Sequence, residues 1–266
     1  MSKKIILLAG PTASGKSKLA IHLAKKLNGE IINADSMQVY KEFTILSSRP
    51  NKSELKKAKH HLYGLISVKK YFSAGDWLKE AKKKIKLCLK NKKLPIIVGG
   101  TGLYFNTITK GISKIPDIDS KTRTKVRNLF KKLGYKKFYE KLLILDPKVK
   151  NKILPSDSQR TQRAYEVKLK TKKSLFDWIA DTKSDFLDYD IKKIFLNTPR
   201  EELLAKIYNR TEQMFKQNCI TEVKKFKSLK LKKSFSAHKL IGVQEIIKYL
   251  DKNLSLDQCK DLINIK

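Results

Sequence analysis

The segment Gly10–Ser17 fits the pattern G-x-x-x-x-G-K-[ST] without a mismatch, and it lies between a predicted strand and a predicted helix. Its glycines let the backbone wrap around a phosphate group, while backbone N–H groups and the positive end of the helix dipole face the anion. Lys16 can reach a terminal phosphate, and the Ser17 hydroxyl can ligate Mg²⁺. We therefore expect a phosphate-binding loop made of Gly10, Pro11, Thr12, Ala13, Ser14, Gly15, Lys16 and Ser17.

Asp35 is the first carboxylate after a second apolar run, Glu30–Ala34. Ligands of open α/β sheets bind beyond the carboxyl ends of the strands, so Asp35 is expected to face the same crevice as the phosphate loop. Two interpretations follow. Asp35 is a general base for a nucleophile that attacks near the phosphates, or it caps the N-terminus of a following helix. The position at a strand end favours the base.

A third apolar run, Leu94–Val98, is followed by Gly99, Gly100 and Thr101, which bring a hydroxyl but no carboxylate. ATPases and GTPases normally hold Mg²⁺ with an acidic residue at such a strand end. The absence of that residue argues against a molecular motor or a nucleotide switch.

These residues need a parallel sheet to position them. The apolar run Ile5–Ala9 predicts a buried first strand, and Ile194–Leu196 predicts a fourth. Thr198 and Pro199 are predicted to be the N-cap and first residue of a further helix. Strands that alternate with helices predict an α/β fold, here a P-loop, kinase-like parallel sheet flanked by helices.

The long segment between the third and fourth strands has a helical pattern and is rich in lysine. Since it is too long for a crossover loop, it predicts an inserted all-helical domain at 117–189. The α/β core then comprises 1–116 and 190–266, and the chain after the fourth strand is mostly helical.

The formal net charge of the 266-residue chain is +35, which favours an anionic partner, although many lysines can simply be solvated surface. Arginine offers a bidentate fork that lysine lacks, and it occurs only seven times. Cys88, Cys219 and Cys259 form no zinc or disulfide pattern, and the helical spacing places Cys88 in the core. Without an apolar run of membrane-spanning length or a signal peptide, a soluble cytoplasmic protein is expected.

Several motifs together resemble those of the tRNA dimethylallyltransferase family, also called tRNA isopentenyltransferases. They run in the family's order across nearly the whole chain. The motifs that begin at Gly99 and at Asp157 are much more specific than the phosphate loop. The matching segments are Gly10–Ser17, Asp35-Ser36-x-x-x-Tyr40, Phe72-Ser73-Ala74-x-Asp76, Gly99-Gly100-Thr101-Gly102-Leu103-Tyr104, Asp157-x-Gln159-Arg160-x-x-Arg163, and Arg200 with Arg210 and Met214.

The resemblance implies transfer of a dimethylallyl group from dimethylallyl diphosphate to N6 of the adenosine 3′-adjacent to the anticodon in tRNA. It implies that Gly10–Ser17 and Arg210 hold the diphosphate, that Mg²⁺ binds at Ser17, and that Lys16 stabilises the leaving pyrophosphate. It further implies that Asp35 takes the N6 proton and that Thr101 contacts the target base or the diphosphate–metal cluster. A monomer without membrane attachment is expected.

The resemblance also implies two sets of tRNA contacts. Ser36, Met37 and Gln38 would line the target base together with Asp35 and Thr101. The anticodon loop would be held by Arg123 and by Gln159, Arg160, Thr161, Gln162 and Arg163. From the residues alone, Arg163 could equally form an ion pair with Glu166, three positions on.

The chain departs from the family pattern at three places. The family usually has Ile-Gly-Thr-Ala-Lys-Pro where this chain has Ile45–Pro50, and Gly-Tyr where it has Gly242 and Val243. The given sequence ends at Lys266, whereas the family normally continues with a basic helix.

Three alternatives remain open from the sequence. One is a small-molecule kinase of the same fold with an arginine-rich lid. Another is an isopentenyltransferase that acts on free adenylate. The third is a basic RNA-binding module with an inactive phosphate loop, which the intact Lys16, Ser17 and Asp35 argue against.

Overall fold

The computed structural model describes residues 3–266, which form two compact units. The first unit contains residues up to Thr107 and Asp188–Lys266, and the second is the intervening segment Ile108–Leu187. The sequence pattern predicts limits of 117 and 189 for the inserted segment. The earlier start reflects a stretch before α5, where Ser184 Oγ donates a hydrogen bond to the Ile108 carbonyl.

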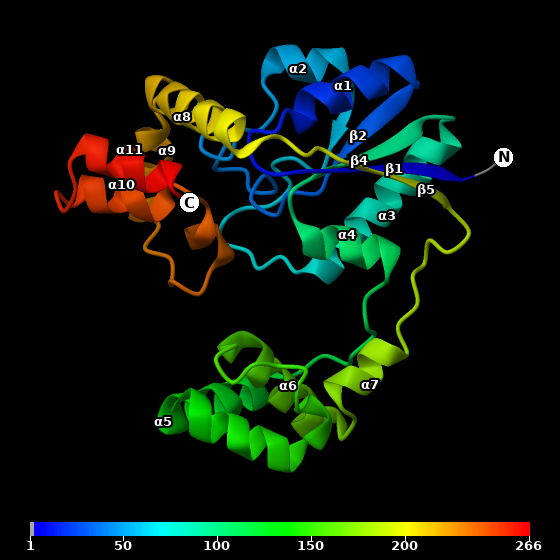
Figure 1. The fold of residues 1–266 in the computed structure, drawn as a ribbon, viewed down its shortest axis with the longest axis vertical. Helices are drawn as coiled ribbons and strands as arrows, with labels where there is room; N and C mark the ends of the chain where they lie inside the picture. The colour runs from blue at the N-terminus through cyan, green and yellow to red at the C-terminus, as the bar shows by residue number, and fades with distance from the viewer. Residues whose placement is uncertain (1–2) are drawn as a thin grey trace. The chain divides into compact units, whose positions relative to one another are not determined.

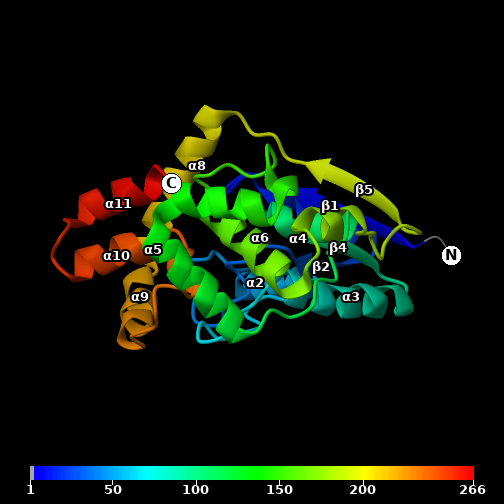
Figure 2. The same ribbon diagram turned by 90° about the horizontal axis from the view of Figure 1, so that it is seen from below.

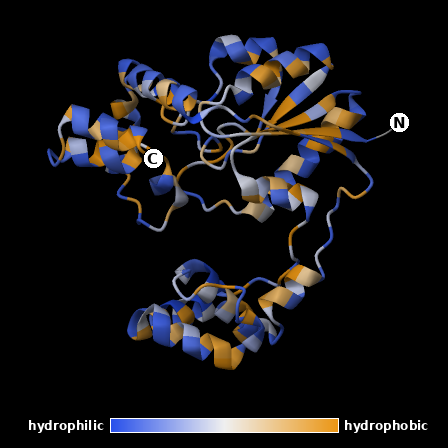
Figure 3. Ribbon diagram, in the orientation of Figure 1, coloured by the Kyte–Doolittle hydropathy of each residue, from blue (hydrophilic) through white to orange (hydrophobic). Residues whose placement is uncertain are grey.

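The first unit is built on a five-stranded sheet in the order β3-β2-β4-β1-β5, in which every pairing is parallel. This confirms the predicted α/β fold with a parallel sheet. In Figure 3 the strands carry mostly apolar residues, as expected for strands covered on both faces. The strands are β1 (Lys4–Ala9), β2 (Gly29–Asn33), β3 (His60–His61), β4 (Leu94–Gly99) and β5 (Asp190–Phe195).

Two strands differ from the sequence-based expectation. β3 was not expected, because two residues are too few to show an alternating pattern, and it pairs with Ile31 and Ile32 at the sheet edge. β5 is longer than expected and pairs with β1 along its whole length. Its lysines at 192 and 193 hide the strand pattern, since they lie at an exposed edge.

Helices cover both faces of the sheet. Figure 1 shows α1 (Lys16–Lys26) and α2 (Lys52–Lys57) on one side, with α3 (Ala74–Lys90) and α4 (Gly102–Thr109) on the other. α3 begins with a capping box in which the Ser73 and Asp76 side chains each accept the other's backbone N–H. Its buried residues include Trp77 and Cys88, which confirms the core position predicted for Cys88.

The C-terminal part of the first unit is helical. It comprises α8 (Arg200–Lys216), α9 (Cys219–Ser228), η2 (Ser236–Lys239), α10 (Val243–Leu250) and α11 (Leu256–Asn264), and α10 lies beside α11 (Figure 2). α8 begins at Arg200 with Pro199 as its N-cap and without a side-chain cap, so the predicted capping role of Thr198 was wrong. Pro199 itself has an extended ψ of 142°, which delays the helix by one residue.

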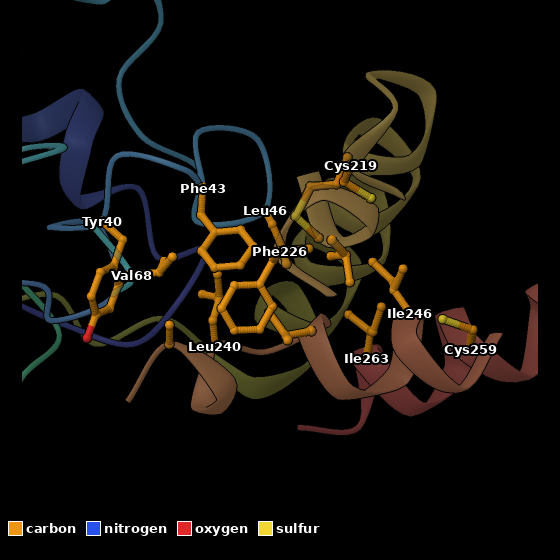
Figure 4. Close-up of a cluster of buried hydrophobic side chains, with 14 of the residues drawn as sticks. Tyr40, Phe43, Leu46, Val68, Cys219, Phe226, Leu240, Ile246, Cys259 and Ile263 are labelled. Atoms are coloured by element: carbon orange, nitrogen blue, oxygen red, sulfur yellow. The ribbon is translucent and has the colours of Figure 1, made fainter. Parts of the chain in front are cut away.

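A large apolar cluster joins these helices to the segment after β2 (Figure 4). Phe43 packs against Phe226 of α9 with ring centroids 5.2 Å apart, and Leu46 and Ile263 lie in the same cluster. The cluster therefore fixes the C-terminal helices against the loop that precedes α2.

The second unit contains α5 (Ser120–Leu145), η1 (Pro147–Val149), α6 (Ser158–Thr171) and α7 (Leu175–Ala180). α5 is kinked at Gly134, whose φ of 71° and ψ of 172° are not helical. A core of Leu142, Val149, Ile153 and Ala164 joins α5 to α6. Lys170 of α6 also forms an ion pair of 2.9 Å with Asp119, the N-cap of α5.

The three cysteines are buried and form no disulfide. Among residues 3–266, no helix combines the length and the apolar character that a membrane span requires.

Candidate active site

The carboxyl ends of three neighbouring strands meet at one edge of the sheet. Ala9 of β1 is paired with Gly99 of β4, and Asn33 of β2 is paired with Val98. The phosphate loop follows β1, Asp35 follows β2 and Thr101 follows β4. The sheet order β2-β4-β1 thus brings together the three segments that the sequence singled out.

Gly99 is what allows two of these segments to approach so closely. A Cβ atom at this position would lie 2.1 Å from the Ala34 carbonyl oxygen and 2.8 Å from the Asp35 nitrogen. The neighbouring Gly100 is different, because the nearest atom to its added Cβ is 3.9 Å away. Gly99 is therefore required for the close packing of β4 against the Asp35 segment.

The phosphate loop has the backbone conformation that such a loop needs. Gly15 is the N-cap of α1 with a φ of 86°, and Ala13 also has a positive φ of 61°. The Lys16 ammonium donates a hydrogen bond to the Pro11 carbonyl and lies 3.5 Å from the Ser14 hydroxyl. Ser17, in the first turn of α1, is exposed. A loop of this conformation before a helix N-terminus offers backbone N–H donors that suit an anion.

Asp35 does not cap a helix. The described segment after it is irregular until α2, and the Asp35 Oδ1 atom accepts a hydrogen bond of 2.8 Å from the Met37 N–H. This is a local turn formed by the side chain with the backbone two residues on. The capping alternative is thus excluded, and the second carboxylate oxygen has no bond within this turn.

Two side chains from neighbouring strand ends hold the Asp35 turn. The buried Asn33 side chain accepts the Asp35 N–H at 2.9 Å and donates to the Asp35 and Leu62 carbonyls at 3.0 and 3.2 Å. Thr101 Oγ1 accepts the Ser36 N–H at 2.9 Å and lies 3.2 Å from the Ser36 hydroxyl. Asn33 was missed by the sequence analysis because a polar residue within an apolar strand shows no site pattern.

Lys16 and Arg210 lie close enough to Asp35 for their charges to interact. Burial lowers the pKa of Lys16, the Asp35 carboxylate opposes that change, and Arg210 adds to it. Burial also lowers the pKa of Arg210, and Asp35 again opposes the change. Two partly desolvated cations therefore flank one carboxylate, which suits a site that binds a polyanion.

A cavity of about 410 Å³ opens beside Asp35 within the first unit. Pro11, Thr12, Asp35 and Arg210 bring polar atoms to its wall. Most of the rest of the wall is apolar and comes from the C-terminal helices and the loop after β2, including Met37, Leu46, Leu203, Ile207, Met214, Leu240, Ile241 and Ile263. A ligand with a charged group and a small apolar group suits this lining.

The three residues expected to line a target base, Ser36, Met37 and Gln38, have different surroundings in the structure. Met37 lines the cavity, whereas Ser36 is engaged with Thr101. The Gln38 amide nitrogen donates to the carbonyls of Ser47 and Ser48, at 2.9 and 3.0 Å, and so fixes a loop. Lys16 and Thr101 are not part of the cavity wall itself.

The second unit carries the residues expected to contact an anticodon loop. Gln159 and Arg160 are exposed in the first turn of α6, and Arg123 is exposed in the first turn of α5. Arg163 lies 3.8 Å from Glu166, so the alternative ion pair exists in this structure. Asp157 caps α6, and together with Gln159, Arg160, Arg163 and Leu175 it lines a shallow cavity.

Thr161 and Gln162 differ from their neighbours. Thr161 has no exposed surface, and its hydroxyl donates to the Asp157 and Ser158 carbonyls. A direct RNA contact of Thr161 is therefore not proposed further. The Gln162 amide donates to the Ser158 carbonyl at 2.9 Å, which leaves its oxygen for other partners.

Among residues 3–266, the structure groups Glu30, His61 and Cys88 at distances that could suit a metal ion. These buried side chains bond to one another instead, with His61 Nε2 and Cys88 Sγ at 2.6 and 3.5 Å from Glu30 Oε2. Burial and the Glu30 carboxylate raise the pKa of Cys88 to about 12, so its thiol stays protonated. This cluster could not be predicted from sequence spacing, because its members come from β2, β3 and α3.

The phosphate loop, the parallel sheet and the inserted helical unit define a P-loop α/β protein with an added helical module. A family model described as IPP transferase matches residues 38–266. The tRNA dimethylallyltransferase of Pelagibacter ubique is 54% identical over 99% of this chain and 84% of its own length. That of Rickettsia massiliae is 44% identical over 99% of this chain and 73% of its own length.

Solved structures agree with these relatives. The full-length tRNA isopentenylpyrophosphate transferase of Bacillus halodurans superposes with a TM-score of 0.69 and 30% identity, over 99% of this chain and 82% of that one. A eukaryotic dimethylallyltransferase acting on tRNA gives a TM-score of 0.85 and 27% identity, over 99% and 67%. The chain belongs to the IPP transferase family, which confirms the resemblance noted in its motifs.

Proposed function

We propose that this protein transfers a dimethylallyl group from dimethylallyl diphosphate to N6 of the adenosine 3′-adjacent to the anticodon in tRNA. The observation that carries the proposal is the cavity beside Asp35, where Arg210 and the phosphate loop meet an apolar wall. A diphosphate with a short branched hydrocarbon combines the two chemical characters that this cavity offers. Membership of the family supports the same activity.

The reaction needs a leaving group to be stabilised and a proton to be removed. The bond between the allylic carbon and the diphosphate oxygen breaks, and the bond from N6 to that carbon forms. Lys16, Arg210 and the loop amides neutralise the charge that develops on the leaving pyrophosphate. Asp35 accepts the N6 proton, and the Asn33 and Thr101 side chains keep its turn in place.

Mg²⁺ fits this site only with the help of the substrate. Among residues 3–266, the phosphate loop has no group of three acidic, histidine or cysteine side chains around it. Mg²⁺ commonly binds through one or two protein oxygens together with phosphate oxygens and water. We propose that the Ser17 hydroxyl supplies the protein ligand, and the ion would add positive charge to the diphosphate.

For tRNA we propose contacts through the exposed Arg123, Gln159 and Arg160 of the second unit, together with the half-buried Gln162 and Arg163. The target base has to leave its stack to reach the half-buried carboxylate of Asp35. The net charge of +35 supports binding to a polyanion. A cytoplasmic location and a monomeric state stay predictions.

The test is nucleoside analysis of unmodified tRNA after incubation with the protein, dimethylallyl diphosphate and Mg²⁺. We expect N6-dimethylallyladenosine with the parent protein and none with Lys16→Ala. Phosphate transfer from ATP to a small acceptor, without any change in tRNA, would instead support the kinase alternative. Prenylation of free adenylate in preference to tRNA would support the alternative of an isopentenyltransferase that acts on free adenylate.

A further inference from the structure

We propose that Glu222 of α9 is a positioning residue that holds one wall of the donor cavity, a role that rests on the function proposed above. Its carboxylate accepts three consecutive backbone N–H groups of the loop after β2. Oε1 accepts those of Thr44 and Ile45 at 2.8 and 2.9 Å, and Oε2 accepts that of Leu46 at 3.0 Å.

The bonded loop is part of the cavity wall. Leu46 and Ser47 both line the cavity, and Leu46 is only 1% exposed. Leu46 also belongs to the apolar cluster that includes Met214 and Ile263, two further wall residues. Glu222 itself does not line the cavity, so it acts on a ligand through the loop.

Glu222 acts together with other contacts of the loop, which include the turn bonds from the Ser48 and Arg49 N–H groups to the Ile45 and Thr44 carbonyls, at 2.9 and 3.0 Å. Phe226, one helical turn after Glu222, packs against Phe43 at a centroid distance of 5.2 Å. On the other side, the Gln38 amide donates to the Ser47 and Ser48 carbonyls. Glu222 and Phe226 of α9 thus hold the loop at residues 43–46. Gln38 holds it at Ser47 and Ser48.

The negative charge of Glu222 interacts with the positive charge of Arg49. Arg49 donates to the Tyr40 carbonyl at 3.1 Å and to the Thr44 hydroxyl at 3.0 Å, which places a cation in the same loop. Three N–H groups that converge on one carboxylate form charge-assisted hydrogen bonds, and these are about twice as strong as neutral ones. Removing the carboxylate leaves those donors without their acceptor.

The variant Glu222→Gln tests this role. The glutamine oxygen can still accept two N–H groups, but its NH₂ group meets the remaining donor, so the loop should loosen with the helix intact. We expect the KM for dimethylallyl diphosphate to rise roughly tenfold, the loss typical of one charged hydrogen bond, with kcat within about threefold. The KM for tRNA should not change.

Hydrogen exchange of residues 44–46 provides a readout independent of activity. We expect faster exchange in Glu222→Gln than in the parent, and no change in Glu80→Gln, whose carboxylate pairs with Lys83 on the surface of α3. Glu222→Ala should show a larger effect in both assays, and a thermal unfolding curve shows whether it still folds.

The possible results distinguish a failure of the positioning role of Glu222 from a failure of the proposed function. Faster exchange with an unchanged donor KM, or unchanged exchange, would overturn the positioning role while the parent still transfers. A large fall in kcat at constant KM would also overturn it, since it would place Glu222 in the chemical step. A parent that transfers no dimethylallyl group would overturn the proposed function itself.

Discussion

The Thr101 hydroxyl oxygen accepts the backbone N–H of Ser36 at 2.9 Å, which ties the end of β4 to the turn that carries Asp35. The Thr101 N–H also donates to the Ala34 carbonyl at 3.2 Å. A hydroxyl at this strand end thus serves the geometry of a carboxylate on the neighbouring strand. Many nucleotide hydrolases have an acidic residue at such a strand end, whereas here the side chain of Thr101 supports the neighbouring turn.

The first prediction concerns Asp35→Asn. Asparagine can keep the turn, because its Oδ1 atom can accept the Met37 N–H as the carboxylate does. The substitution removes the proton acceptor, so single-turnover transfer should fall by about 10²–10⁴ while tRNA and donor binding change little. Rates are measured with saturating tRNA. A variant that reacts within a few-fold of the parent would exclude Asp35 as the base.

The second prediction compares two adjacent glycines. Gly99→Ala places a Cβ atom 2.1 Å from the Ala34 carbonyl oxygen, and a shift of the Asp35 segment has to relieve the contact. We expect a loss of about 1–3 kcal/mol in the free energy of unfolding, together with a marked loss of transfer. Gly100→Ala is the control, since its nearest neighbour is 3.9 Å away. Equal effects in urea unfolding would contradict the packing role of Gly99.

The third prediction concerns RNA affinity. Arg160→Ala and Arg163→Ala should weaken tRNA binding and leave the affinity for dimethylallyl diphosphate unchanged. Binding by the parent should weaken by roughly tenfold or more between 50 and 200 mM salt, because several phosphates lose counterions. Lys79→Ala, an exposed position of α3, controls for the loss of one charge. A flat salt response would show that the high charge has no role in RNA binding.

The fourth prediction concerns acid stability. Burial opposes the charged form of Glu30, but hydrogen bonds from His61 and Cys88 outweigh it and lower the pKa of this carboxyl below its ordinary value of 4.5. The resulting stabilisation is complete above pH 4.5 and is lost as the pH falls through the lowered pKa. The difference in unfolding free energy between the parent and Glu30→Gln should therefore shrink below pH 4.5.

Urea unfolding between pH 3 and 7 measures that difference, a range set by where carboxyl groups titrate. Glu80→Gln is again the control, because its surface ion pair with Lys83 contributes little. A pH-independent difference would mean that Glu30 stabilises the protein by packing alone.

The parallel sheet and the phosphate loop could be predicted because their signals are local. Apolar runs mark β1, β2 and β4, and the positions of the two loop glycines follow from one motif. The edge strands were harder to predict. β3 is too short for a pattern, and β5 carries lysines at the sheet edge.

The supports of the site could not be predicted, because they join residues far apart in the chain. Glu222 bonds to Thr44, and Asn33 bonds to the Leu62 carbonyl, through contacts that no spacing reveals. The choice between base and cap for Asp35 also needed the structure, since both interpretations use the same residue type. The turn geometry excludes the cap.

The two ends of the second unit lie against each other, and this affects how the chain can fold. Gly111 approaches the Lys183 backbone so closely that a Cβ atom would lie 2.3 Å from its carbonyl oxygen. Once the second unit has folded, its first and last residues are neighbours. The effective length of the connection between β4 and β5 is then much shorter. The entropy cost of closing a loop grows with its length, and early formation of the insert would therefore ease the pairing of β5 with β1.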